Sequence, residues 1–400
     1  MKTLLVDDDS FALQLLARQL SNLGFVNIIQ CMRAREAIAM LESDAARFGL
    51  VFCDLQMPEM DGIEFVRQLV RIGYRGGLTL VSGEDERILR TAERLARAHH
   101  LDVLGALNKP VSPHTLQELL ARHALHVASQ PHAVHRTYTP QQLRLAIDNG
   151  QLLNHYQPKV SLASGALIGV ETLVRWQHPD DGLVEPDQFI GIAEDHGLID
   201  DLTRTVLTAA LHQGGAWHAG GLPLQVAINI SMDNLDSLDF PDMVEREAAA
   251  AGMPLRHLVL EVTESRLMKD PLSPLDILTR LRLKHIDLSI DDFGTGHSSL
   301  AQLRDIPFTE LKIDRGFVHG ASRNAYLQVI LEASLGMARQ MGMKTVAEGV
   351  EERADWDLLR ASGCDVAQGY LVGKPMPAAE LPRWLCEWEN RRGALLANAA

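Results

Sequence analysis

Cysteine is scarce in this chain, and the few cysteines lie far apart. The 400 residues contain four of them, and no two form a C-x-x-C pair: Cys31, Cys53, Cys364 and Cys386. A disulfide framework needs a regular set of cysteine spacings, so the sequence does not predict one. This usage is typical of a reducing compartment, and we expect a cytoplasmic protein.

Long apolar runs are also absent. No stretch approaches the roughly 18 apolar residues that a membrane-spanning helix requires. The apolar run Thr3–Val6 is followed at once by Asp7, Asp8 and Asp9, which is too early for a signal peptide. The sequence therefore predicts neither membrane insertion nor export.

Positive charge is in deficit. Lysine and arginine number 38 against 52 aspartates and glutamates, which gives a net charge of −14. Duplex DNA is bound by clustered basic side chains, so we do not expect DNA as a partner. A phosphate ligand would then be bound through metal ions. Because 46% of the residues are hydrophobic, the chain is able to bury more than one core.

Two series of alternating strand and helix patterns divide the chain. In residues 1–122, five apolar runs are each followed by helical periodicity: Thr3–Val6, Phe25–Gln30, Leu50–Cys53, Leu78–Val81 and Asp102–Leu107. This alternation predicts a doubly wound α/β domain with a parallel sheet. Its first helix has Ser10 as the expected N-cap. Residues 123–139 are rich in Ala, Ser, Pro and His and are predicted to form a linker.

The second series covers residues 140–395. Its length, about 250 residues, is that of a TIM-like (β/α)₈ barrel. The strand-like runs are Ala166–Val170, Leu224–Ile230, Leu258–Val262, Asp287–Ile290, Glu310–Ile313, Lys344–Ala347 and Asp365–Ala367. In such a barrel the functional residues lie where the strands end.

Polar side chains follow the predicted strands of the first domain. They are Asp7 and Asp8 after the first strand, Asp54 after the third, Ser82 after the fourth and Lys109 after the fifth. The carboxyl ends of parallel strands meet at one edge of a sheet, so these residues are expected to converge. Three carboxylates together repel one another unless a hard divalent cation lies among them, which predicts a Mg²⁺ site. A lysine and a hydroxyl beside that site suit a phosphoryl group.

The predicted strands of the second domain end in a larger polar set with five acids: Glu171, Asn229, Glu261, Asp291, Asp292, Lys312, Glu348 and Gln368. So many buried carboxylates require about two divalent ions, and oxygen donors favour Mg²⁺ or Mn²⁺. Two such ions about 4 Å apart are typical of phosphodiester hydrolysis. Lys312 would orient the attacking water or screen charge, and Arg175 would hold a phosphate oxygen.

The motifs of the first domain resemble the receiver domains of two-component response regulators. The resemblance spans residues 1–122 and rests on Leu5–Asp8, Asp54–Gly62, Ser82 and Lys109–Pro110. It implies a flavodoxin-like fold in which a sensor histidine kinase or a phosphotransfer protein phosphorylates Asp54. It also implies Mg²⁺ at Asp7 and Asp8, with Ser82 and Lys109 at the phosphoryl group. One departure is Ala106, where the family often has an aromatic switch residue.

The second domain resembles the EAL family of cyclic di-GMP phosphodiesterases over residues 140–390. The motifs are Glu171–Trp176, Asn229–Ser231, Glu261–Glu264, Asp291–Gly296, Lys312–Asp314, Ala347–Glu351 and Gln368–Tyr370. The resemblance implies hydrolysis of cyclic di-GMP to linear pGpG. One metal ion is implied at Glu171, Asn229, Glu261 and Asp291, and a second at Asp291, Asp292 and Glu348. Glu348 would be a ligand or the general base, Lys312 and Glu171 would also be catalytic, and Asp314 would support Lys312. The implied substrate residues are Gln157, Arg175 and Gln368.

The same resemblance implies a loop that couples dimerisation to metal binding. It includes Phe293, Gly294, Thr295 and Gly296, with Glu264 as its anchor, and it predicts a homodimer or a higher homo-oligomer. Three departures from the family pattern are Thr172, His297 and Gly316, and none of them removes a metal ligand.

The leading hypothesis is thus a response regulator whose phosphodiesterase activity is modulated by phosphorylation. One alternative is a catalytically silent domain that binds cyclic di-GMP or docks a protein, although silent members typically lose metal-binding acids. The other is a receiver that mainly competes for phosphoryl groups. No GG[DE]EF signature occurs, so synthesis of the dinucleotide is not predicted.

Overall fold

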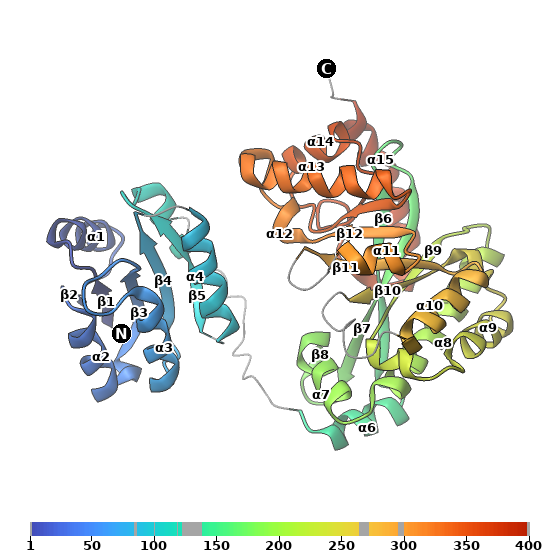
Figure 1. The fold of residues 1–400 in the computed structure, drawn as a ribbon, viewed down its shortest axis with the longest axis horizontal. Coiled ribbons are helices and arrows are strands. Elements are labelled where there is room, and N and C mark those ends of the chain that lie inside the picture. Colours follow the sequence, from blue (N-terminus) through green and yellow to red (C-terminus); the bar gives the residue numbers. More distant parts are fainter. Residues whose placement is uncertain are drawn as a thin grey trace. The chain divides into compact units, whose positions relative to one another are not determined.

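A computed structural model describes residues 2–83, 86–99, 101–117, 119–121, 138–263, 272–294 and 300–397. The chain divides into two compact units, Met1–Arg136 and Thr137–Ala400 (Figure 1). No helix in the described ranges combines the length and the apolar character that crossing a bilayer demands.

The first unit contains a parallel sheet of five strands in the order β2-β1-β3-β4-β5. The strands are β1 (Lys2–Val6), β2 (Ile28–Cys31), β3 (Phe48–Asp54), β4 (Gly77–Ser82) and β5 (Asp102–Asn108). Consecutive residues such as Leu4, Leu5 and Val6 are all buried, because helices cover both faces of a parallel sheet. The flavodoxin-like fold predicted from the sequence is confirmed.

Four described helices and one helical stretch cover this sheet (Figure 1). Residues of α1 (Ser10–Asn22) pack with residues of the helical ranges 113–117 and 119–121 in one core cluster. Residues of α2 (Ala34–Ser43), α3 (Gly62–Ile72) and α4 (Glu86–Ala98) pack in the other. The N-cap of α1 was predicted one residue too late: Asp9, not Ser10, accepts a hydrogen bond from the Phe11 amide, at 2.8 Å.

Eight strands of the second unit close into a barrel, because the first of them pairs with both the second and the last. They are β6 (Leu152–Ser161), β7 (Leu167–His178), β9 (Gln225–Ile230), β10 (Leu258–Thr263), β11 (Asp287–Phe293), β12 (Glu310–Ile313), β13 (Lys344–Ala347) and β14 (Val366–Ala367). The short strands β8 (Gly182–Val184) and β15 (Met376–Pro377) extend the sheet beyond the ring. The predicted barrel is confirmed.

Strand β6 was missed in the sequence, and it runs antiparallel to both of its neighbours in the ring. Its apolar pattern is interrupted by Asn154, His155, Gln157, Pro158 and Lys159, so it lacks the signature of a buried strand. Gln157 and Lys159 are nevertheless buried, and alternation along the strand places them on the same face.

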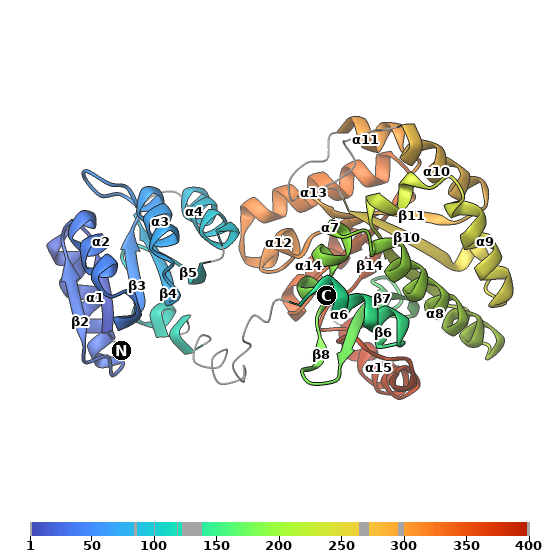
Figure 2. The ribbon, with the colours of Figure 1, turned by 90° about the horizontal axis from the view of Figure 1, so that it is seen from below.

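Helices surround the barrel strands, as Figure 2 shows for α8, α9, α10 and α13. The helices of this unit are α6 (Pro140–Asp148), α7 (Ile190–Asp195), α8 (Ile199–Ala219), α9 (Phe240–Ala250), α10 (Leu272–Leu283), α11 (Leu300–Asp305), α12 (Arg315–Val318), α13 (Ala325–Gln340), α14 (Arg353–Ala361) and α15 (Leu381–Leu396). In β9, Val226, Ile228 and Ile230 belong to the apolar core, whereas the intervening Asn229 faces the other way. The same alternation directs the polar residues of the other strands into the barrel.

Candidate active site of the barrel and acidic site of the sheet

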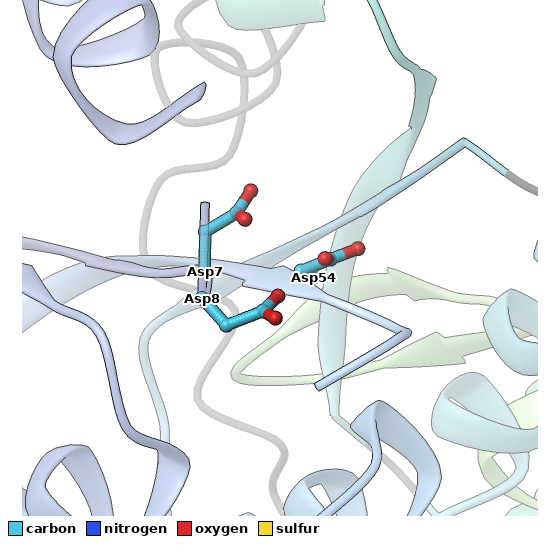
Figure 3. A group of neighbouring side chains, drawn as sticks. All are labelled: Asp7, Asp8 and Asp54. Carbon is cyan, nitrogen blue, oxygen red and sulfur yellow. The ribbon is translucent and has the colours of Figure 1, made fainter. Parts of the chain in front are cut away.

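Three aspartates meet at the carboxyl edge of the five-stranded sheet (Figure 3). Asp7 follows β1, and Asp54 is the last residue of the neighbouring strand β3. Asp7, Asp8 and Asp54 each offer an oxygen, and these oxygens lie within 4.8 Å of one another. Asp7 and Asp54 are buried and Asp8 is exposed, so the group opens to solvent on one side. Oxygen donors in this arrangement suit Mg²⁺.

Lys109 bridges two of these carboxylates. Its Nζ lies 2.8 Å from Asp7 Oδ2 and 2.8 Å from Asp54 Oδ2. Burial alone would lower the pKa of Lys109, but the two aspartates raise it. Burial raises the pKa of Asp7. Ser82, the buried last residue of β4, accepts the Lys109 amide on its carbonyl at 2.7 Å, so all five residues singled out in the sequence gather at this edge.

Inside the barrel, the acids form two groups that share one residue. Oxygens of Glu171, Glu261 and Asp291 lie within 4.8 Å of one another, and so do oxygens of Asp291, Asp292 and Glu348. Glu171, Glu261 and Asp291 are buried. The sequence placed Glu171 and Asp291 directly after their strands, whereas they lie within β7 and β11; Glu261 lies within β10, as the predicted strand Leu258–Val262 implies. β7 is much longer than predicted because it also pairs with β6.

An unusual backbone conformation brings Asp292 into the second group. Adjacent residues of a regular strand point to opposite faces, so Asp291 and Asp292 would normally diverge. Asp292 has φ 53°, in the left-handed region, and the register of β11 against β12 shifts between Ile290 and Phe293. Aspartate tolerates this region better than most residues. The turn allows two consecutive carboxylates to serve one site.

Lys312 lies at the centre of the acids and is 1% exposed. Its Nζ is 2.7 Å from Glu261 Oε2, 2.7 Å from Glu348 Oε1 and 3.0 Å from Asp291 Oδ1. Although burial alone would lower the pKa of Lys312, the surrounding carboxylates raise it, so the side chain stays charged. It therefore offsets part of the repulsion among the acids.

The acids themselves differ in how tightly they hold a proton. Burial raises the pKa of Glu348 to about 8, despite the nearby Lys312. Burial also raises the pKa of Glu171, and Glu261 adds repulsion. Burial opposes the ionisation of Glu261 as well, yet Lys159 and Lys312 lower its pKa to about 2. Glu261 is thus a fixed negative charge, whereas Glu348 can accept and release a proton near neutral pH.

Amide side chains form hydrogen bonds to Glu171 in the first group of acids. Asn229 Nδ2 donates to Glu171 Oε1 at 2.8 Å, and Gln368 Nε2 donates to Glu171 Oε2 and, at 3.0 Å, to Gln157 Oε1. Gln157 is anchored by its own donation to the Gly373 carbonyl at 3.0 Å. Gln368 Oε1 is buried and has no hydrogen-bond partner among the described residues. A buried acceptor of this kind is costly unless a bound group satisfies it.

A cleft of about 280 Å³ opens above these residues. It is lined by Gln157, Glu171, Leu173, Asp291, Lys312, Arg315, Glu348, Gly349, Glu351, Gln368, Gly369 and Tyr370. Arg315 and Tyr370 were not among the predicted site residues, although Arg315 lies beside the motif Lys312–Asp314 and Tyr370 ends the motif Gln368–Tyr370. Arg315 pairs with Glu351 at 2.9 Å, and Tyr370 is 56% exposed at the rim.

A second cavity of about 240 Å³ shares Leu173 with this cleft. Its walls are mainly apolar and come from β7, α7, α8 and β9, with Ile190, Leu202 and Val206 among them. Thr172 also lines it, because the residue after Glu171 in β7 faces away from the acids. The departure at Thr172 therefore leaves the carboxylate group untouched.

Comparison with known proteins identifies the family of each domain. The family model of the EAL domain matches residues 140–375, and that of the response regulator receiver domain matches residues 3–121. A curated relative, the cyclic di-GMP phosphodiesterase RocR of Pseudomonas aeruginosa, is 32% identical over 94% of this chain and 96% of its own length. This chain belongs to the EAL-domain family. It has a receiver domain before the EAL domain.

Two further comparisons concern the EAL domain alone. The bifunctional diguanylate cyclase and cyclic di-GMP phosphodiesterase MucR of Pseudomonas aeruginosa is 42% identical over 60% of this chain and 35% of its own. A solved structure of the MucR phosphodiesterase in complex with c-di-GMP has a TM-score of 0.57 and 42% identity. It covers 60% of this chain and 98% of that one.

Some predicted residues of the EAL domain lie away from the cleft. Arg175 is buried further along β7, where its Nε lies 3.0 Å from Glu185 Oε2, and it does not line the cleft. Asp314 caps α12 by accepting the Gly316 amide at 2.8 Å, so it shapes the turn after Lys312. An added Cβ at residue 316 would lie 2.8 Å from Asp314 Oδ1, so the Asp314 side chain would have to shift slightly.

The predicted coupling loop is described only in part. Phe293 ends β11 and packs against the core of the barrel, and Gly294 has φ 96°, which favours glycine. Glu264, Thr295, Gly296 and His297 lie outside the described residues, as does nearly all of the predicted linker. In the receiver domain, Ala106 lies in β5 and packs against the core beneath α2, α3 and α4.

Proposed function

We propose that the EAL domain hydrolyses cyclic di-GMP to linear pGpG with two divalent ions, Mg²⁺ or Mn²⁺. The observation that carries this proposal is the pair of carboxylate groups that share Asp291. Two ions bridged by one carboxylate are the usual arrangement for displacement at phosphorus. The names of RocR and of the MucR complex support cyclic di-GMP as the ligand.

The donor set fits two hard divalent ions. All of the ligands are oxygens, from Glu171, Asn229, Glu261 and Asp291 for one ion and from Asp291, Asp292 and Glu348 for the other. Lys312 alone offsets only part of this negative charge at the centre. Bound ions would supply an activated water and stabilise the charge that develops on the phosphate.

The side chains of this chain would then divide the chemistry. Without ions, burial raises the pKa of Glu348 to about 8; bound ions would lower that pKa, and the ionised carboxylate then accepts the proton of the attacking water as the new P–O bond forms. Lys312 stabilises the negative charge of the phosphate in a site that excludes bulk water. One ester P–O bond to a ribose 3′ oxygen breaks, that oxygen takes up a proton, and the product is linear with a 5′ phosphate.

The two adjoining cavities suit the two kinds of surface that the substrate presents. Gln157 and Gln368 line the polar cleft, where their amides can bind the substrate's phosphates and sugars. The exposed ring of Tyr370 offers a face on which a guanine can stack, and Arg315 lies beside it in the lining. The apolar cavity beyond Leu173 accommodates a second base. Arg175 would reach a phosphate only after leaving Glu185.

We further propose that a sensor histidine kinase or a phosphotransfer protein phosphorylates Asp54, and that this modulates hydrolysis. A Mg²⁺ ion at Asp7, Asp8 and Asp54, with Lys109 beside it, supports phosphoryl transfer. The domain limits that we propose are 1–122 and 140–395, joined by the linker 123–139, with a homodimer or higher homo-oligomer in the cytoplasm.

Two alternatives belong to other classes of function. A silent EAL domain would bind cyclic di-GMP without cleaving it, and the complete set of acids argues against this. A receiver that competes for phosphoryl groups would accept phosphate with no change in hydrolysis.

The deciding experiment is hydrolysis of cyclic di-GMP by the purified full chain with Mg²⁺ or Mn²⁺, followed by chromatography of pGpG. We expect Glu171→Ala to abolish the product. The matched control is Glu389→Ala, which removes a half-exposed surface glutamate that pairs with Arg392 on α15 and should leave activity unchanged. If the wild-type protein binds the dinucleotide but cleaves none with either ion, phosphorylated or not, the receptor function replaces this proposal.

A further inference from the structure

A second buried lysine lies beneath the carboxylate groups of the EAL barrel. Lys159 belongs to β6, the strand that the sequence pattern did not indicate, and it is 5% exposed. Its Nζ lies 2.5 Å from Glu261 Oε1 and 3.5 Å from Glu310 Oε1. An ammonium group so deeply buried is stable only when it is paired, and these two carboxylates pair it.

Glu261 is held on both of its oxygens by different lysines. Lys159 contacts Oε1, and Lys312 contacts Oε2 at 2.7 Å. Lys312 also contacts Asp291 and Glu348, so Oε2 faces the acids of the proposed metal site. Oε1 therefore points to the opposite side, toward the closed interior. A carboxylate fixed at one oxygen presents the other in a defined direction.

Lys159 itself has no access to the substrate. It does not line the cleft, whereas Lys312 does. The strand register explains this difference. Glu261 of β10 pairs with Ser289 of β11, and Ser289 pairs with Glu310, the first residue of β12, so Glu261 and Glu310 lie at the same level of the barrel. Lys159 therefore bridges Glu261 to a glutamate that lies two residues before Lys312 in the same strand. Its contacts belong to a layer of the barrel below the cleft.

We propose that Lys159 is a positioning residue of the metal site: it fixes Glu261 from below and supplies a permanent positive charge to the carboxylate groups. The inference rests on the proposed function, because it assigns a role toward the ions of that site. Glu310 in turn holds Lys159 from its other side. Lys159 is thus part of the outer support that orients a metal ligand without touching the ion.

Removing Lys159 alone would leave both Glu261 and Glu310 buried without this partner, and the barrel would lose stability for that reason. The principal variant is therefore Lys159→Met with Glu310→Gln, which removes the pair and keeps similar volumes. The control is Glu310→Gln alone, because Lys159 then still holds Glu261. A third variant, Lys159→Gln, keeps an N–H donor and removes the charge, and it decides the question if the double variant does not fold.

The measurement is direct Mn²⁺ binding to the full chain by titration calorimetry, with the thermal unfolding midpoint taken without Mn²⁺. Asp291→Ala removes the carboxylate that both barrel groups share, and the heat that remains in this variant is taken as that of the receiver site and subtracted. We expect the double variant to bind Mn²⁺ to the barrel at least about tenfold more weakly while unfolding within a few degrees of the wild type. The control should remain within about twofold in affinity, and Lys159→Gln should lie between the two.

The inference would be overturned if the double variant bound Mn²⁺ to the barrel with an affinity within about twofold of the wild type. If the double variant is unfolded, the same criterion applies to Lys159→Gln. An equal loss of affinity in the control would also overturn it, because Glu310 would then be responsible. The Mn²⁺ concentration for half-maximal hydrolysis should rise in parallel with the binding constant. If the wild type binds Mn²⁺ but does not hydrolyse cyclic di-GMP, the proposed function fails while the binding measurement still tests Lys159.

Discussion

Replacing Glu348 with glutamine separates catalysis from stability in the EAL domain. Glu348 Oε1 lies 2.7 Å from Lys312 Nζ, and burial raises the pKa of Glu348 to about 8. At pH 7, before an ion binds, this side chain already carries a proton, so the neutral amide of similar shape changes little in the fold. Lys312 keeps its contacts with Glu261 and Asp291. We expect a loss in the free energy of unfolding of less than about 1 kcal/mol.

Catalysis should respond very differently. A general base contributes about 100-fold to 10,000-fold to the rate, or about 3 to 5 kcal/mol of the barrier. We therefore expect kcat of Glu348→Gln to fall by at least about 100-fold, while the unfolding midpoint moves by less than about 4 °C. The assays are pGpG production at saturating Mn²⁺ and thermal unfolding with EDTA, both at pH 7.

The matched control is Glu352→Gln in the same loop, where the glutamate is partly exposed and pairs with Arg323. Both its activity and its unfolding midpoint should stay near the wild-type values, because surface ion pairs contribute little. Activity of Glu348→Gln within about tenfold of the wild type would refute the role of base. A large drop in its unfolding midpoint would refute the inference that the folded protein holds a proton there.

Three further predictions follow from other parts of the structure. Asp54→Asn should abolish phosphorylation by a small phosphodonor and any change in hydrolysis that depends on it, with basal pGpG production kept; an unchanged response would refute that coupling. Between about pH 4.5 and 8, Glu348 keeps a proton in the folded barrel but loses it in the unfolded chain. The free energy of unfolding in EDTA should therefore fall as the pH rises through that range, which calorimetry would measure. A flat profile would contradict the raised pKa of Glu348. Gly369→Ala should lower activity at least about tenfold, because φ is 153° and the added Cβ would lie 2.3 Å from the Val350 amide nitrogen, next to Gln368. Its control is Gly336→Ala on α13, where no atom of the described residues beyond the surrounding turns of that helix lies within 4 Å of the added Cβ; this variant should not reduce activity.

The amino-acid sequence by itself was enough to predict the fold class and to identify most of the acidic residues of the two sites. Alternating strand and helix patterns are local, so the five-stranded sheet and most of the barrel strands could be predicted from them. Acids at equivalent places in successive strands must converge in either fold, which is why Asp54 and Asp291 could be placed beside other carboxylates.

The tertiary structure alone decided how the buried charges are paired. Strand β6 carries Gln157 and Lys159 into the barrel, and its polar pattern resembles a loop until the strand is seen closing the ring. The left-handed backbone at Asp292 and the engagement of Arg175 with Glu185 likewise depend on neighbours distant in the sequence. The alternation of apolar and polar residues indicates which side of a strand is buried. A buried lysine, however, is stable only beside carboxylates that other strands supply, and that pairing exists only once the barrel has closed.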